Sequence, residues 1–102
     1  MTVEEFLKIL QSSGIEFRYG VFKKSAKCPF GIFMEEEPEK VFADGITAIQ
    51  LKSFRIELYN DKKDPTVEQQ LENALTNAGI SFSRLDDIYL ENEGLHEAVY
   101  EV

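Results

Sequence analysis

The chain has 102 residues, of which 43% are hydrophobic, and this fits one folded domain, residues 1–102, around one core. No apolar run approaches the roughly 18 residues that a membrane helix needs, so no membrane association is expected. The net charge of −8 comes from residues 64–102, where nine acids face one base, while residues 1–63 hold ten of each. Such a negative surface repels phosphate groups and argues against a protein that grips nucleic acid.

The start of the chain predicts a cytoplasmic protein. Positions 4 and 5 are acidic, and the basic stretch followed by an apolar stretch that marks a signal peptide is missing. The single cysteine, Cys28, allows no internal disulfide and agrees weakly with a reducing compartment.

A first helix is predicted from residue 3 to the glycine at position 14. Thr2 and Glu5 form a capping box, in which each side chain can bind a free backbone N–H of the first turn. The apolar residues of the segment recur at helical spacing: Val3, Phe6, Leu7 and Leu10. Gly14 can take the left-handed conformation that ends a helix.

A second helix is predicted after Asp64, which can cap it, with Pro65 at the first helical position where its missing N–H costs nothing. Its apolar stripe consists of Val67, Leu71, Ala74, Leu75 and Ala78. Gly79 is the predicted stop.

The remaining segments predict a mainly antiparallel sheet. Strands are expected at residues 15–21, 29–35, 46–59, 80–90 and 95–102, with a short additional strand at 41–43. Phe30, Ile32 and Met34 are predicted to share the face of the core. A change of apolar phase predicts a bulge near Lys52 and Ser53. The expected fold is therefore α+β, in the order α-β-β-β-α-β-β.

No residue pattern predicts a catalytic, cofactor or metal site. His96 has no cysteine or second histidine at ligand spacing, and we interpret it as a surface residue on a strand. Cys28 and His96 could act as nucleophile and base only if the fold joined them, and nothing local supports that. The acidic runs at 35–39 and 86–87 lack the spacing of a calcium loop. We expect no enzyme activity, no cofactor and no small-molecule ligand.

Several large side chains fall out of phase with the core positions of their strands, so that the sheet is predicted to be apolar on both faces. Two explanations stay open: each helix covers one face, or the second face packs on a neighbouring subunit. The residues expected at a subunit interface are Phe22, Phe33, Phe42, Tyr59, Tyr89 and Val99.

The segment Arg55–Pro65 resembles small neck proteins of long-tailed phages and prophages, which lie between the head–tail connector and the major tail protein. The similarity continues through Val67, Glu68, Leu71 and Glu72. It extends to Glu5–Leu7, Pro29–Ile32, Ala43–Gly45 and Val99–Glu101, and so covers nearly the whole chain.

Among these neck proteins, the tail-terminator (tail-completion) proteins have an α-β-β-β-α-β core, which the predicted order matches. The resemblance implies a ring, typically of six subunits, that caps the tail tube and docks it to the head, and it implies no catalytic residue. It also implies assembly in the cytoplasm of a bacterial host and a final place in the virion. The expected partners are other copies of the chain, the tail-tube protein and the head connector.

DNA would pass such a ring without sticking if acidic residues lined the lumen, and the candidates are Glu91, Glu93 and Glu97. Two alternatives to a tail terminator remain open. One is another neck component, such as a head-closure protein. The other is a small acidic binding or DNA-mimicking module that occupies a basic partner.

Overall fold

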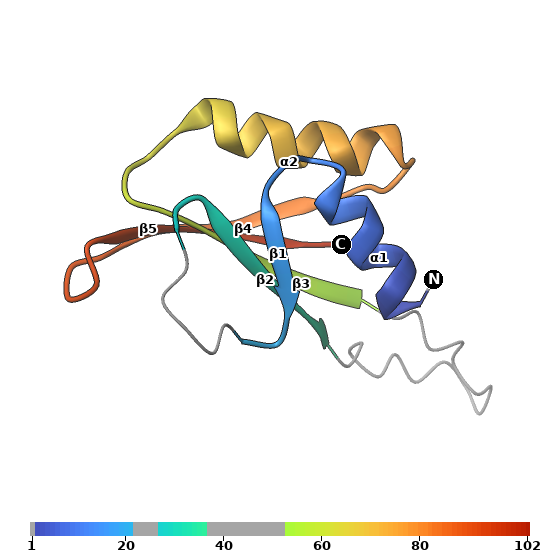
Figure 1. Ribbon diagram of the computed structural model, residues 1–102, viewed down its shortest axis with the longest axis horizontal. Helices are drawn as coiled ribbons and strands as arrows, with labels where there is room; N and C mark the ends of the chain where they lie inside the picture. Colours follow the sequence, from blue (N-terminus) through green and yellow to red (C-terminus); the bar gives the residue numbers. More distant parts are fainter. Residues whose placement is uncertain (1, 22–26, 37–52) are drawn as a thin grey trace, which may run out of the picture.

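The computed structural model describes residues 2–21, 27–36 and 53–102. Their elements run α1 (Val3–Gln11), β1 (Glu16–Tyr19), β2 (Phe30–Glu36), β3 (Ser53–Asn60), α2 (Pro65–Asn77), β4 (Ser83–Leu90) and β5 (Leu95–Glu101). Figure 1 shows the two helices and the twisted five-stranded sheet. The predicted α+β class and the element order are confirmed. No helix in the described part of the chain is long and apolar enough to cross a membrane.

The predicted helix ends are confirmed. The Thr2 hydroxyl accepts a hydrogen bond from the backbone N–H of Glu5, and the Asp64 side chain does the same for Thr66. Gly14 and Gly79 follow the two helices with φ values of +85° and +75°, the left-handed conformation that relieves the last carbonyls.

The sheet has the strand order β1-β2-β3-β5-β4. β2, β3, β5 and β4 pair antiparallel, whereas β1 pairs with β2 in parallel. The expected, mainly antiparallel sheet is therefore confirmed, with β1 as the parallel strand among the described ones. Alternation within a strand does not reveal whether the strand runs parallel or antiparallel to its neighbour.

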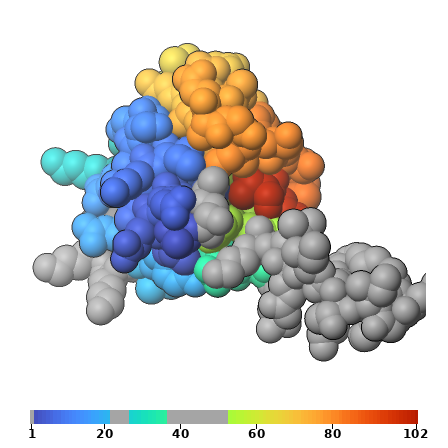
Figure 2. All heavy atoms as spheres, turned by 90° about the vertical axis from the view of Figure 1, so that its right-hand side faces the viewer, coloured from blue at the N-terminus to red at the C-terminus, as the bar shows by residue number. Residues whose placement is uncertain are grey.

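Both helices cover the same face of the sheet. Phe6 and Leu10 of α1 and Leu71 and Leu75 of α2 belong to one buried cluster. The sheet residues of that cluster share one face by register: Phe17, Phe33, Phe54, Ile56, Leu58, Ala98 and Tyr100. Figure 2 shows α1 and α2 packed side by side. The explanation in which each helix covers its own face is thus wrong.

The phase predicted for β2 was reversed. Phe33 is fully buried in the core cluster, and Gly31 also faces the helices, so that Phe30, Ile32 and Met34 lie on the opposite face. Three apolar residues in alternation misled the prediction, because both phases of this strand are apolar and only packing against α1 selects one.

A bulge was predicted near Lys52 and Ser53: Ser53 pairs with Glu36 in unbroken register, and Lys52 lies outside the described residues. The strand predicted at 41–43 and the first part of the strand from 46 also lie outside them. The sheet does shift register elsewhere, between Arg84 and Asp86 of β4. This shift sends both Arg84 and Asp87 toward the helices and leaves Leu85 between them, half exposed.

Candidate functional site

The exposed large apolar side chains of the described chain gather at the two edges of the sheet. Tyr19 and Val21, which are 50% and 67% exposed, lie in β1 and just after it. Leu85, Ile88 and Tyr89 are 49%, 37% and 59% exposed and all belong to β4. β1 and β4 are the first and last strands of the sheet, so each has one side that no described strand pairs. Unpaired edges with apolar side chains can add a strand from another chain.

The face of the sheet opposite the helices, here called the outer face, has an apolar centre. Its apolar members follow from the register of the strands: Phe30, Ile32 and Met34 of β2, Tyr59 of β3, Leu95 and Val99 of β5, and Ile88 and Leu90 of β4. The Phe30 and Tyr59 rings stack with their centroids 5.2 Å apart. No described helix covers these residues.

Acidic residues surround this centre. By the same register the outer face has six acids against two bases, Arg18 and Arg55, so that its net charge is −4. The acids are Glu16, Glu36, Glu57, Asp86, Glu97 and Glu101.

Tyr59 links the apolar centre to the acids. Its hydroxyl donates a hydrogen bond to Glu57 Oε2 at 2.7 Å, and the register places Glu97 opposite it on β5. Burial, together with hydrogen bonds to Glu97 and Glu57, raises the pKa of Tyr59. Arg55 in turn donates to Glu57 Oε1 from Nε at 3.1 Å. The carboxylate of Glu57 is thereby held by a neighbour on each side, and its side chain is only 15% exposed.

The residues predicted for a subunit interface separate into different environments. Phe33 is in the core and cannot serve a neighbour, because it packs edge-on against Phe6 with ring centroids 5.5 Å apart. Tyr59 and Val99 do lie on the outer face, although Val99 is only 1% exposed. Tyr89 is exposed on β4, whereas Phe22 and Phe42 lie outside the described residues.

The three acids predicted to line a lumen do not form one group. Glu91 and Glu93 are exposed in the turn between β4 and β5. Glu97 is half-buried on the outer face beside Tyr59. The three acids are close in the sequence, but the pleat of β5 directs Glu97 to the outer face.

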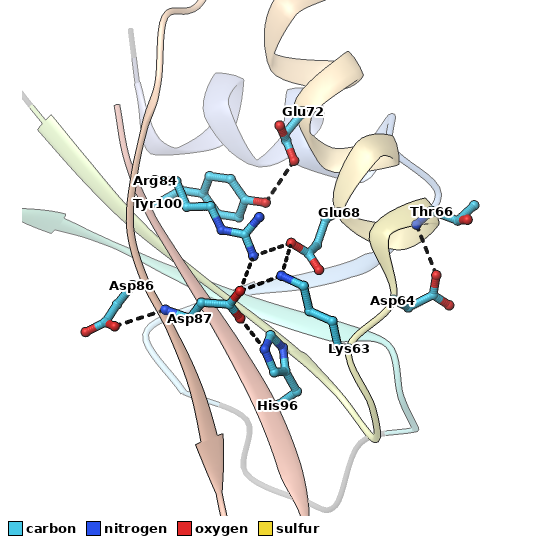
Figure 3. A network of polar contacts seen from close by, with 10 residues as sticks. All are labelled: Lys63, Asp64, Thr66, Glu68, Glu72, Arg84, Asp86, Asp87, His96 and Tyr100. Carbon is cyan, nitrogen blue, oxygen red and sulfur yellow. Dashed lines mark hydrogen bonds and ion pairs between the residues drawn. The ribbon is translucent and has the colours of Figure 1, made fainter.

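A second cluster, here called the polar network, joins α2 to β4 and β5 (Figure 3). Lys63 Nζ donates to Glu68 Oε1 at 3.1 Å and to Asp87 Oδ2 at 2.5 Å. Arg84 contacts the same two carboxylates, and its distance to Asp87 Oδ2 is 3.1 Å. Glu68 is only 4% exposed, and these two cations are the opposite charges that it contacts in the network.

His96 also belongs to the polar network, through an ion pair of its Nε2 with Asp87 Oδ1. Its side chain is 12% exposed, so the interpretation of His96 as a surface residue was wrong. Although burial opposes it, the hydrogen bond from Lys63 and the nearby positive groups lower the pKa of Asp87. The signal was absent from the sequence, since residues 63, 68, 84, 87 and 96 meet only when α2 packs on the sheet.

The polar network has the character of a structural clamp. The hydrogen bond of Tyr100 to Glu72 Oε2, at 3.1 Å, extends it along α2, and the Arg84 guanidinium lies 5.6 Å from the Tyr100 ring centre. The adjoining pocket, between α2 and the ends of β3 and β5, encloses about 10 Å³. That volume accommodates about one water molecule and no organic substrate.

Cys28 is half-buried in the segment before β2. Burial, and then the negative charge of Asp61, raise the pKa of its thiol, which disfavours the reactive thiolate. His96 contacts Asp87 rather than this thiol. Among the described residues, no group of three or more histidine, cysteine, aspartate or glutamate side chains is placed to hold a metal ion.

Comparison with known proteins identifies no relative: no protein-family model matches the chain, and no curated protein matches its sequence.

Proposed function

We propose that the protein is a non-enzymatic structural subunit of a phage or prophage neck. In this role several copies form a ring, typically of six, at the head-proximal end of the tail tube and join tail to head through protein–protein contacts. The proposal rests on the resemblance of Arg55–Pro65 and the other segments to neck proteins, and the α+β element order agrees with it.

The observation that carries the proposal is the placement of exposed apolar side chains at opposite edges of the sheet. A closed ring needs a heterologous interface, in which one surface of a subunit meets a different surface of the next. Tyr19 and Val21 supply one such surface, and Leu85, Ile88 and Tyr89 supply the other. Pairing of a β4 edge with a β1 edge would continue the sheet from one copy to the next and bury both groups.

Charge favours this pairing over contact between two β4 edges. β4 carries adjacent acids, Asp86 and Asp87, which a symmetric antiparallel pairing would bring close to their own copies. β1 has one acid and one base, Glu16 and Arg18, which form an ion pair with an N–O distance of 3.4 Å. The two edges therefore meet without the like-charge repulsion of a β4–β4 pair.

Light scattering after size exclusion, over a wide range of protein concentration, tests the proposal. We expect the molar mass to rise with concentration toward that of about six chains, and negative-stain electron microscopy to show rings with a central channel. A protein that stays monomeric at every concentration, or that stops at two chains, would contradict the self-assembling ring.

A pair of matched variants locates the contact. Leu85→Lys adds a charge to the β4 edge and should prevent the rise in mass without unfolding the chain, because Leu85 is half exposed. Gln70→Lys adds the same charge to the exposed side of α2 and should assemble as the native protein does. Equal behaviour of the two variants would show that the β4 edge takes no part.

A further inference from the structure

The outer face has a composition that differs from that of the two edges. Its centre is apolar and aromatic, with Phe30 stacked on Tyr59 and with Ile32 and Met34 beside them on β2. These four side chains are half-buried rather than exposed, because long charged side chains surround them. An apolar centre within a polar rim is the usual anatomy of a protein–protein contact surface.

The rim of the outer face is negatively charged. Its two arginines are already engaged by acids of the same face: Arg18 by Glu16, and Arg55 by Glu57 and Glu36. The excess of four negative charges is therefore not cancelled by the rim itself. Glu97 and Glu101 of β5 lie along one side of the apolar centre, four residues apart and each two residues from Val99.

One acid beside the apolar centre, Glu57, is held in place before any partner arrives. The Tyr59 hydroxyl and Arg55 fix both oxygens of Glu57, at 2.7 and 3.1 Å. Groups that are ordered in the free protein lose little conformational entropy on binding. This favours the outer face as a binding surface over an acidic surface that is merely solvated.

We propose that the outer face binds a segment of another protein in which lysine or arginine side chains alternate with apolar ones. The apolar side chains would cover Tyr59, Ile32 and Met34, and the basic ones would reach the carboxylates of Glu97 and Glu101.

The net charge of the outer face selects this occupant over others. Two copies of the chain joined through their outer faces would place two surfaces of net charge −4 against each other, and their repulsion is unfavourable. Nucleic acid and anionic lipid surfaces carry phosphate groups and meet the same repulsion. A neutral apolar segment would leave the acidic rim without a counter-charge, whereas a basic one satisfies both parts of the surface.

This inference does not rest on the proposed ring. The ring uses the edges β1 and β4, whereas the residues proposed to contact the basic segment belong to β2, β3 and β5 between these edges, so that they can bind with or without a ring. A negative result in the ring test says nothing against binding at the outer face. The experiment below is done at a protein concentration at which light scattering shows a single oligomeric state.

Methyl NMR of the full chain, titrated with a nine-residue peptide of alternating valine and lysine, tests the proposal. We expect saturable shifts of the outer methyl groups of Ile32, Met34 and Val99, while those of Ile56 and Leu71 in the core stay in place. A peptide of alternating glycine and lysine provides charge without apolar contact and should bind at least about tenfold more weakly. A peptide of alternating valine and glutamate should not bind.

Matched variants separate the outer face from general negative charge. The double variant Glu97→Gln/Glu101→Gln should raise the Kd of the valine–lysine peptide by about three- to tenfold, since each change removes one charge pair with the peptide at the rim of the surface. Glu91→Gln/Glu93→Gln removes the same charge from the turn between β4 and β5 and should leave the Kd unchanged.

Several results would overturn the inference. These are the absence of saturable binding, equal weakening by the two double variants, or equal affinity for the glycine–lysine peptide. Shifts of the outer methyl groups on simple concentration of the protein would assign the face to a second copy instead. Saturable shifts confined to the turn at 91–94 would place the binding outside the outer face.

Discussion

Gly31 of β2 lies directly against the ring of Phe17 on the parallel strand β1. A Cβ added to Gly31 would overlap the edge of this ring, and Phe17 is itself 2% exposed and cannot swing into solvent. Any residue could adopt the backbone conformation of Gly31. Glycine is required at this position because the Phe17 ring approaches too closely to leave room for a Cβ.

Gly31→Ala should therefore destabilise the fold. Overpacking of a core by a methyl group costs about 1–3 kcal/mol, which urea denaturation would measure. Phe17→Leu replaces the ring by a smaller aliphatic side chain and should reduce the penalty of Gly31→Ala when the two are combined. If the two effects simply add in the double variant, the contact between these residues is not the cause.

Glu68→Gln tests the polar network. The substitution keeps the shape of the side chain but leaves Lys63 and Arg84 facing a single carboxylate, that of Asp87. We expect a loss of about 1–3 kcal/mol in the free energy of unfolding, the usual cost of a buried charged hydrogen bond. Glu91→Gln, in the exposed turn, changes the formal charge equally and should alter stability by less than about 0.5 kcal/mol. A Glu68 variant as stable as this control would mean that the polar network does not clamp α2 to the sheet.

The raised pKa of Tyr59 predicts a loss of stability in alkali. The folded state holds the phenol proton more tightly than the unfolded chain, whose tyrosines titrate near 10.0. The stabilisation is therefore complete below pH 10 and declines as the pH rises above it. Tyr59→Phe should be less stable than the native chain at pH 7 by about 0.5–1.5 kcal/mol, because it loses the hydrogen bond to Glu57.

The same variant should lose less stability than the native chain between about pH 10 and 11, since its residue 59 no longer titrates. Urea denaturation at a series of pH values gives, for each protein, the slope of the free energy of unfolding against pH. Parallel slopes for the two proteins would contradict the assignment of this effect to Tyr59.

Asp64→Ala tests the cap of α2. The Asp64 carboxylate accepts a hydrogen bond from the backbone N–H of Thr66 at 3.0 Å, and its loss should cost about 1 kcal/mol. Thermal unfolding would show the change as a lower Tm. Asp61→Ala, in the exposed segment before the cap, removes the same charge and should leave Tm nearly unchanged.

Local signals were sufficient for the helices. Thr2, Asp64, Gly14 and Gly79 determine where they begin and end through hydrogen bonds and backbone conformations of their own neighbourhood, and each was predicted correctly. The positions of β4, β5 and the turn between them also followed from the sequence, because alternation and turn residues act over a few positions.

Only the tertiary structure decided which face each strand presents. β2 is apolar in both phases, and packing on α1 placed Phe33 in the core and Phe30 outside. The parallel pairing of β1, and the position of both helices on one side, likewise depend on contacts between distant segments.

The polar network and the outer face also arise from contacts between segments that are distant in the sequence. The spacing in the sequence does not predict the contact among Lys63, Glu68, Asp87 and His96. They meet because a register shift in β4 directs Asp87 toward α2. The sequence by itself determined the elements, their order and the total charge of this protein. Its folding determined how that charge and the apolar side chains are distributed over surfaces, because side-chain direction in a sheet depends on strand register and on the layer packed above it.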